Sequence, residues 1–133
     1  MIVVDSNVIA YLFLRSEHTV AAERLLAQEP EWAAPILWRS EFRNILTGHM
    51  RLRSLPYEQA LHLQYAAETL LAGAEFEPES SAVLSLVRDS SCSAYDCEFV
   101  ALAMMLGTKL VTMDKKLTRA FPQSIVSLAQ WAH

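Results

Sequence analysis

Short apolar runs alternate along the chain with longer segments in which apolar residues recur every three or four positions. The short runs are typical of buried parallel strands, and the longer pattern is typical of amphipathic helices. The runs that predict strands are residues 2–5, 32–36, 74–77, 109–112 and 125–128. The segments that predict helices are residues 7–14, 17–28, 37–50, 56–71, 80–88 and 94–106. Strands that alternate with helices favour an α/β fold, here a three-layer αβα sandwich around a central, mainly parallel sheet.

Individual residues mark some of the helix ends. Ser16 can cap the helix that follows it, because a serine hydroxyl accepts a hydrogen bond from an N–H group of the first turn. Pro56 suits the first position of the helix that it opens, where no backbone N–H is needed. Gly107 can end the strongest helical pattern, since glycine readily adopts the left-handed conformation of a helix C-terminus.

The length and composition indicate one domain. A chain of 133 residues can bury a core without disulfides, so we expect a single domain over residues 1–133. Hydrophobic residues make up 53%, above the ~45–50% usual for soluble domains. This surplus favours a further buried surface, such as a homo-oligomer or partner interface. No apolar stretch reaches the ~18 residues of a membrane span, and the N-terminus lacks signal-peptide features, so we expect a cytoplasmic protein.

Charge and special residues exclude several kinds of site. A formal net charge of −4 argues against a broad basic surface for nucleic acid. It does not exclude a nucleic acid substrate, because acids gathered at a metal site subtract from the net charge. Three glycines are too few for a P-loop or a dinucleotide-binding loop. Cys92 and Cys97 lack the spacing of a redox or zinc motif, so we expect free thiols.

Four acidic residues lie inside apolar segments that are far apart in the sequence. They are Asp5 in MIVVDSNVIAYLF, Glu41 in WRSEFRNIL, Asp96 in SAYDCEFVALAMM and Asp114 in KLVTMDKKL. A carboxylate at the edge of a core is costly unless a cation, hydrogen bonds or a metal compensates it. Four of them, at positions where α/β folds carry functional groups, predict one shared site.

The position of each acid leaves two interpretations open. Asp5 and Asp114 directly follow predicted strands, at the sheet edge where ligands bind, but each could instead cap the next helix. Glu41 and Asp96 lie near the starts of helices and on their apolar faces. An acid there also complements the helix dipole, although that small gain suits an exposed acid better. We therefore expect Glu41 and Asp96 to be functional, and leave both interpretations open for Asp5 and Asp114.

Four converging carboxylates would repel one another unless a cation lay between them. Oxygen-only ligands suit a hard divalent ion such as Mg²⁺ or Mn²⁺, which can activate water and stabilise charge on a phosphate. The expected chemistry is metal-dependent hydrolysis of phosphodiester bonds, in which one carboxylate can also orient the attacking water. Asn7 and Thr112 could bond to the acids or to metal-bound water, and the alternative for both is local turn formation.

Basic residues flank these acids in the sequence and could contact a phosphate backbone, although a solvated surface charge is the simpler interpretation for each. They are Arg39, Arg43, Lys115, Lys116 and Arg119.

Together the four acidic segments resemble the PIN-domain ribonucleases, and most closely the VapC toxins of toxin–antitoxin modules. The match runs in the right order over nearly the whole chain. Cys97 stands where a small residue is expected, and residues 56–78 carry no diagnostic motif. The resemblance implies an αβα sandwich and Mg²⁺- or Mn²⁺-dependent cleavage of RNA. By this resemblance, the catalytic and metal-binding residues are Asp5, Glu41, Asp96 and Asp114, with Asn7 and Thr112 as supporting residues.

The resemblance also implies partners. Similar proteins form homodimers, and a small separate antitoxin inhibits them by laying a segment across an apolar groove near the site. Two other functions compete with the ribonuclease. A phosphatase with Asp5 as nucleophile would need a second acid two residues later, where the chain has Asn7. A catalytically inactive PIN-like module that binds RNA or protein would have little reason to keep four mutually repelling acids.

Overall fold

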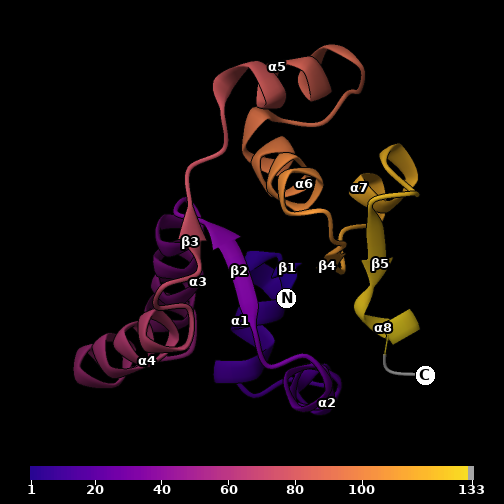
Figure 1. Ribbon diagram of the computed structural model, residues 1–133. Coiled ribbons are helices and arrows are strands. Elements are labelled where there is room, and N and C mark those ends of the chain that lie inside the picture. The colour runs from indigo at the N-terminus through magenta and orange to yellow at the C-terminus, as the bar shows by residue number, and fades with distance from the viewer. Residues whose placement is uncertain (132–133) are drawn as a thin grey trace.

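A five-stranded parallel sheet forms the centre of the molecule, with the strand order β3-β2-β1-β4-β5 (Figure 1). The computed structural model describes residues 1–131. The strands are β1 (Ile2–Val4), β2 (Trp32–Pro35), β3 (Glu75–Phe76), β4 (Leu110–Thr112) and β5 (Ile125–Ser127). The helices are α1 (Ser6–Phe13), α2 (Thr19–Gln28), α3 (Trp38–Leu52), α4 (Tyr57–Leu70), α5 (Ser80–Arg88), α6 (Ala94–Leu106), α7 (Lys115–Ala120) and α8 (Leu128–Trp131).

Helices flank the sheet and confirm the predicted three-layer α/β fold. Helix α6 packs against β1, β2 and β4, and α5 packs on α6. Helix α1 contacts β4 and also packs against α2 and α3. Figure 1 shows α3 and α4 side by side next to β3, at one edge of the sheet. In the part of the chain that the structure describes, no helix is long and apolar enough to cross a membrane.

The core lies around the two central strands. All three residues of β1 and all three of β4 are buried, as expected for parallel strands covered on both faces. The large side chains packed around them include Trp32, Trp38, Phe42 and Phe99, all fully buried. Burying a side chain of this size contributes on the order of 1.5–3 kcal/mol to the hydrophobic stabilisation.

The strand order brings two acid-bearing strand ends together. From β1 the chain moves outward through β2 to β3, and then returns to β4 on the other side of β1. In the register between them, Val4 pairs with Val111. Asp5 and Asp114 follow β1 and β4, so both lie at the carboxyl ends of neighbouring strands. Open α/β sheets bind ligands at such a switch point in the strand order.

The predicted helix ends are partly right. Gly107 ends α6 with a φ of 65°, which confirms its predicted role. The prediction for Ser16 is wrong, because α2 begins at Thr19 and its N-cap residue is His18. The Ser16 hydroxyl instead accepts a hydrogen bond from the His18 N–H, and the Ser16 N–H donates to Thr19 Oγ1. The short helices α7 and α8 have no predicted counterpart, since a four- to six-residue helix shows too little periodicity.

Candidate functional site

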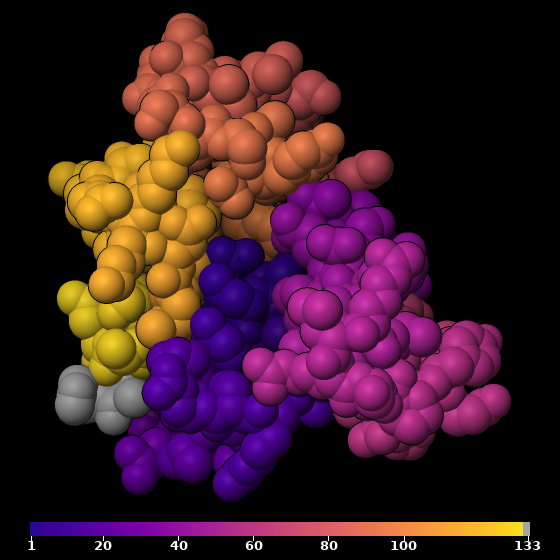
Figure 2. Space-filling view, turned by 180° about the vertical axis from the view of Figure 1, so that it is seen from behind, coloured from indigo at the N-terminus to yellow at the C-terminus, as the bar shows by residue number. Residues whose placement is uncertain are grey.

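The four predicted acids line one open pocket of about 460 Å³ at the carboxyl edge of the sheet. Asp5 follows β1, and Asp114 lies two residues beyond the end of β4. Glu41 and Asp96 lie in the first turns of α3 and α6. Figure 2 shows the N-terminal segment, in indigo, at the surface between the orange segment that includes α6 and the magenta segment that includes α3. The structure thus brings all four acids together, while their catalytic roles remain a prediction.

Asp5 is the most strongly perturbed acid of the pocket. Its Oδ1 accepts a hydrogen bond from the Ser6 N–H at 2.8 Å, and its Oδ2 accepts one from the Thr112 hydroxyl at 2.7 Å. The pKa of Asp5 is raised to about 6, mainly by burial and in smaller part by the charges of Glu41 and Asp96, although the two hydrogen bonds act in the opposite direction. Loss of water around the carboxylate therefore outweighs its local hydrogen bonds.

Glu41 is held by a contact with the first helix. The Ser6 hydroxyl, which is buried, donates a hydrogen bond to Glu41 Oε1 at 2.7 Å. Burial is the main reason that the pKa of Glu41 is raised, and the charges of Asp96 and Glu98 add to it. Ser6 thus contacts two acids of the pocket, Asp5 through its N–H and Glu41 through its hydroxyl.

Asp96 lies in the first turn of a helix whose N-terminus is capped by a side chain. Ser93 is the N-cap residue of α6, and its hydroxyl accepts a hydrogen bond from the Asp96 N–H at 3.1 Å. Burial raises the pKa of Asp96, the nearby charge of Asp114 raises it further, and Lys116 acts in the opposite direction. Three acids of the pocket therefore have raised pKa values, the mark of carboxylates gathered in a partly desolvated site.

The helix-cap interpretation of Asp114 is correct, and it is compatible with a place in the pocket. Its Oδ1 accepts hydrogen bonds from the N–H groups of Lys116 and Leu117, at 2.9 and 3.2 Å. Asp5 likewise occupies the N-cap position of α1, but its side chain bonds only to the first N–H, that of Ser6. The two interpretations that the sequence left open are therefore not exclusive.

Both predicted supporting residues lie at the site. Thr112 is fully buried, and its hydroxyl donates to Asp5 while accepting from the Asp114 N–H at 3.0 Å. Asn7 lines the pocket, and its Oδ1 is buried without a hydrogen-bond partner among the described residues. A buried carbonyl oxygen without a partner is costly, so a rotation of the Asn7 side chain towards a donor bound in the pocket would relieve that cost.

The basic residues that flank the acids in sequence lie at different places. Arg39 points away from the acids and forms ion pairs with Glu68 and Glu75. Arg43 lines a different groove, between α3 and α4. The charge of Lys116 does reach Asp96, from the start of α7. Of these basic residues, Lys116 is the one whose charge acts on an acid of the pocket, which places it near the site.

The donor set fits a hard divalent cation, because the pocket offers carboxylate and amide oxygens and no sulfur or imidazole. In residues 1–131, however, no three His, Cys, Asp or Glu side chains are arranged so that they could hold a metal ion. The hydrogen bonds of Ser6, Thr112 and the α7 amides engage several of the carboxylate oxygens. For three of the carboxylates to bind one metal ion, their side chains would therefore have to move within the open pocket.

Sequence reasoning missed Ser93, although a serine three residues before an acid is the pattern of a helix N-cap. Ser6 is only a weak candidate in the sequence, weaker than Asn7 or Thr112, because its partner Glu41 lies 35 residues away. Asn44 and Tyr95, which sequence reasoning also missed, line the pocket as well.

Comparison with known proteins identifies the family. A family model for the PIN domain matches residues 2–121, so the chain belongs to the PIN-domain family and the resemblance is confirmed. The chain is 31% identical over 127 residues to Ribonuclease VapC3 from Pyrobaculum aerophilum, and the match covers 91% of this chain and 95% of the relative.

Solved structures agree with this fold. PAE2754 from Pyrobaculum aerophilum superposes with a TM-score of 0.77 at 19% identity, over 98% of this chain and 85% of the other. A toxin–antitoxin complex from Klebsiella pneumoniae gives a TM-score of 0.71 at 16% identity, over 96% and 98% of the two chains. At these identities the likeness shows the fold alone.

Proposed function

We propose that this protein is an Mg²⁺- or Mn²⁺-dependent endoribonuclease and the toxin component of a toxin–antitoxin module. The observation that carries the proposal is the single pocket lined by Asp5, Glu41, Asp96 and Asp114. Membership of the PIN-domain family and the 31% identity to a relative named as a ribonuclease support it.

In the proposed mechanism, Asp5, Glu41, Asp96 and Asp114 would hold the cation, and the cation would attract the RNA phosphate that the carboxylates alone would repel. A bound divalent ion supplies two effects, a lowered pKa for water and stabilisation of the charge that develops on the phosphate. Asp5, which has a pKa of about 6, is partly protonated near neutral pH and would lose its proton when it ligates a cation. One ionised carboxylate would then orient the attacking water.

The proposed partner is a small antitoxin whose apolar segment lies beside this pocket. A groove of about 190 Å³ between α1 and α3 shares Asn7 and Ile45 with the acidic pocket, and Ala10, Tyr11 and Leu14 continue it. The fold likeness to a chain of a toxin–antitoxin complex supports such a partner. Expression of this protein alone should arrest cell growth, and co-expression of the small protein encoded beside it should restore that growth. Leu14→Glu should abolish the rescue, whereas Val20→Glu at an exposed position of α2 should not.

A homodimer is also part of the proposal. Helices α5 and α6 expose Leu84, Met104 and Met105, each more than half exposed, and large apolar side chains at a surface favour an interface. Sedimentation equilibrium should give twice the 15.0 kDa of the chain. Met104→Glu combined with Met105→Glu should shift the mass to the monomer, and a monomeric wild type would remove this part of the proposal.

The activity is tested on a mixed RNA pool that includes tRNA. Purified protein is incubated with Mg²⁺, with Mn²⁺ and with a chelator, next to Asp96→Asn and to Glu98→Gln. Glu98 is a matched control, because it lies on the same helix but lines a separate pocket with Glu77. Products that require metal, disappear in Asp96→Asn and persist in Glu98→Gln are expected. RNA binding without cleavage under every condition would favour the inactive binding module.

A further inference from the structure

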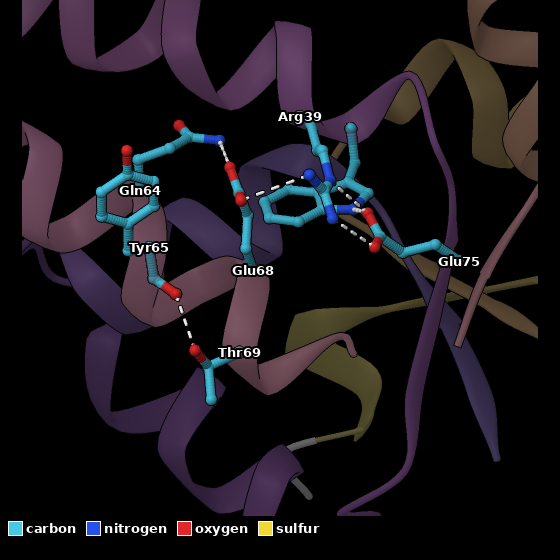
Figure 3. Close-up of polar contacts among 7 residues, drawn as sticks. Arg39, Gln64, Tyr65, Glu68, Thr69 and Glu75 are labelled. Atoms are coloured by element: carbon cyan, nitrogen blue, oxygen red, sulfur yellow. Dashed lines mark hydrogen bonds and ion pairs between the residues drawn. The ribbon is translucent and has the colours of Figure 1, made fainter. Parts of the chain in front are cut away.

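Arg39 lies at the centre of a polar network that joins three elements (Figure 3). Its Nε and Nη2 donate to the two carboxylate oxygens of Glu75, at 2.6 and 2.7 Å. Its Nη1 donates to Glu68 at 3.2 Å, and Gln64 donates to the other oxygen of Glu68 at 2.9 Å. A two-pronged contact of this kind fixes direction as well as distance. The network therefore ties the first turn of α3 to strand β3 and to helix α4.

Trp38 strengthens the same anchor. Its side chain is fully buried, and its indole N–H donates to Glu75 Oε2 at 2.8 Å. Glu75 thus accepts hydrogen bonds from two consecutive residues of α3, and the Arg39 contact is the main reason that the pKa of Glu75 lies below its usual value. Strand β3 pairs with β2, so Glu75 is itself fixed to the sheet.

The first turn of α3 lacks the usual means of fixing a helix start. Its N-cap residue is Leu37, which provides no side-chain hydrogen bond to the helix. The N-caps of α1, α6 and α7 do provide one, through Asp5, Ser93 and Asp114. Among the helices that carry or follow the acids, α3 therefore depends on side chains within its first turn.

Glu41 lies two residues after Arg39 in that turn. Two residues correspond to about 200° around an α-helix, so Arg39 and Glu41 face nearly opposite directions. Glu41 faces the pocket, where the charges of Asp5 and Asp96 repel it. The anchor acts on the far face of the same turn and can resist that repulsion.

We propose that Arg39, through Glu75, is a positioning residue that holds the first turn of α3 and with it Glu41 in the acidic pocket. One readout of this inference, the Mn²⁺ affinity, rests on the proposed metal site. The other, amide hydrogen exchange in the first turn of α3, does not depend on that site. Arg39 itself does not line the acidic pocket, and its hydrogen-bond partners are Glu68 and Glu75.

The test compares Arg39→Gln, Arg39→Lys and Glu75→Gln with wild type. Mn²⁺ affinity is measured directly, under conditions in which each variant is folded, and amide hydrogen exchange is followed at Ser40 and Glu41, whose N–H groups both donate to the Leu37 carbonyl. Arg39→Gln should raise the Mn²⁺ dissociation constant by on the order of tenfold, the lower end of what outer partners of metal ligands contribute. It should also speed exchange at these two amides, and Arg39→Lys should recover part of both effects.

Two controls separate positioning from stability. Val83→Ala in α5 removes core packing away from α3, and Arg88→Gln removes an exposed arginine–carboxylate pair on the same helix. Both should leave the Mn²⁺ affinity and the exchange at Ser40 and Glu41 unchanged. If Arg39→Gln lowers only the melting temperature, as Val83→Ala does, the inference is overturned.

Failure of the proposed function gives a different pattern. If wild type binds no Mn²⁺, the metal site is refuted, and the exchange measurement alone decides on Arg39. Faster exchange confined to the first turn of α3 would then support the anchor, and unchanged exchange would refute it. If Arg39→Gln does not fold, Glu75→Gln and Arg39→Lys provide the same comparisons.

Discussion

Two hydroxyl side chains fix three of the acids in the pocket. Ser6 contacts Asp5 through its N–H and Glu41 through its hydroxyl, and Thr112 links Asp5 to the backbone of Asp114. Hydrogen bonds to a carboxylate favour its charged form, so they offset part of the cost of burial. For Asp5 burial remains the larger effect, which leaves a carboxyl group whose ionisation opposes folding.

The first residue-scale prediction concerns Asp5→Asn in the presence of a chelator. The pKa of Asp5 rises from 3.8 to about 6 on folding, so its contribution to stability is fully present below about pH 4 and is lost as the pH rises through about 6. The variant should therefore unfold with a free energy up to about 3 kcal/mol higher than wild type at about pH 8. Urea unfolding at several pH values measures this difference, which should close towards about pH 4.

Asp89 provides a control of opposite sign. The adjacent Arg88 lowers its pKa, so Asp89 stabilises the fold above its ordinary pKa and loses this effect as the pH falls. Asp89→Asn should therefore be the less stable protein near neutral pH. A stability difference for Asp5→Asn that did not change with pH would contradict the burial of its charge.

The second residue-scale prediction concerns Thr112. Thr112→Val keeps the shape of the side chain but removes the donor to Asp5 and the acceptor for the Asp114 N–H. Leaving buried polar groups unpaired costs about 1–3 kcal/mol, so the variant should lose stability on this scale as well as Mn²⁺ affinity. Thr112→Ser keeps the hydroxyl and should retain the affinity. Equal affinities in Thr112→Val and wild type would show that Thr112 does not support the site.

At the scale of elements, the acids depend on how each helix begins. Local signals made part of this predictable, because Asp5 and Asp114 follow short apolar strands and Gly107 marks the end of α6. The contacts of Ser6 with Glu41 and of Arg39 with Glu75 were not predictable, since they join residues 35 and 36 positions apart. Such pairs are decided by the order of the strands, which the local pattern does not specify.

The element-scale prediction concerns the start of α6. Ser93→Ala removes the side chain that caps the helix at the Asp96 N–H, which should lower the free energy of unfolding by about 1 kcal/mol. It should also weaken Mn²⁺ binding, because the first turn of α6 carries Asp96. Ser93→Asn preserves a capping side chain and should behave as wild type. Thermal unfolding with and without Mn²⁺ measures both effects. If Ser93→Ala responds to Mn²⁺ as wild type does, the helix cap does not contribute to Mn²⁺ binding.

At the scale of the whole molecule, the sheet explains why distant acids meet. The alternation of strands and helices was sufficient to predict a parallel α/β sandwich, and parallel strands place their carboxyl ends at one edge. The detailed arrangement of the acids was not predictable, because hydrogen bonds from Ser6, Thr112 and the start of α7 direct the oxygens individually. The sheet topology therefore determines where the pocket lies, whereas the hydrogen bonds of individual residues determine where the carboxylate oxygens point within it.

The most direct measurement of the shared acidic site is thermal unfolding with increasing Mn²⁺. Wild type and five variants are compared, Asp5→Asn, Glu41→Gln, Asp96→Asn, Asp114→Asn and the control Glu98→Gln. A ligand that binds only the folded state at about a hundred times its Kd adds about 2.7 kcal/mol of stability. Mn²⁺ is expected to raise the melting temperature of wild type and Glu98→Gln, and to raise that of the four site variants less. A response that survives unchanged in all four would contradict the shared site.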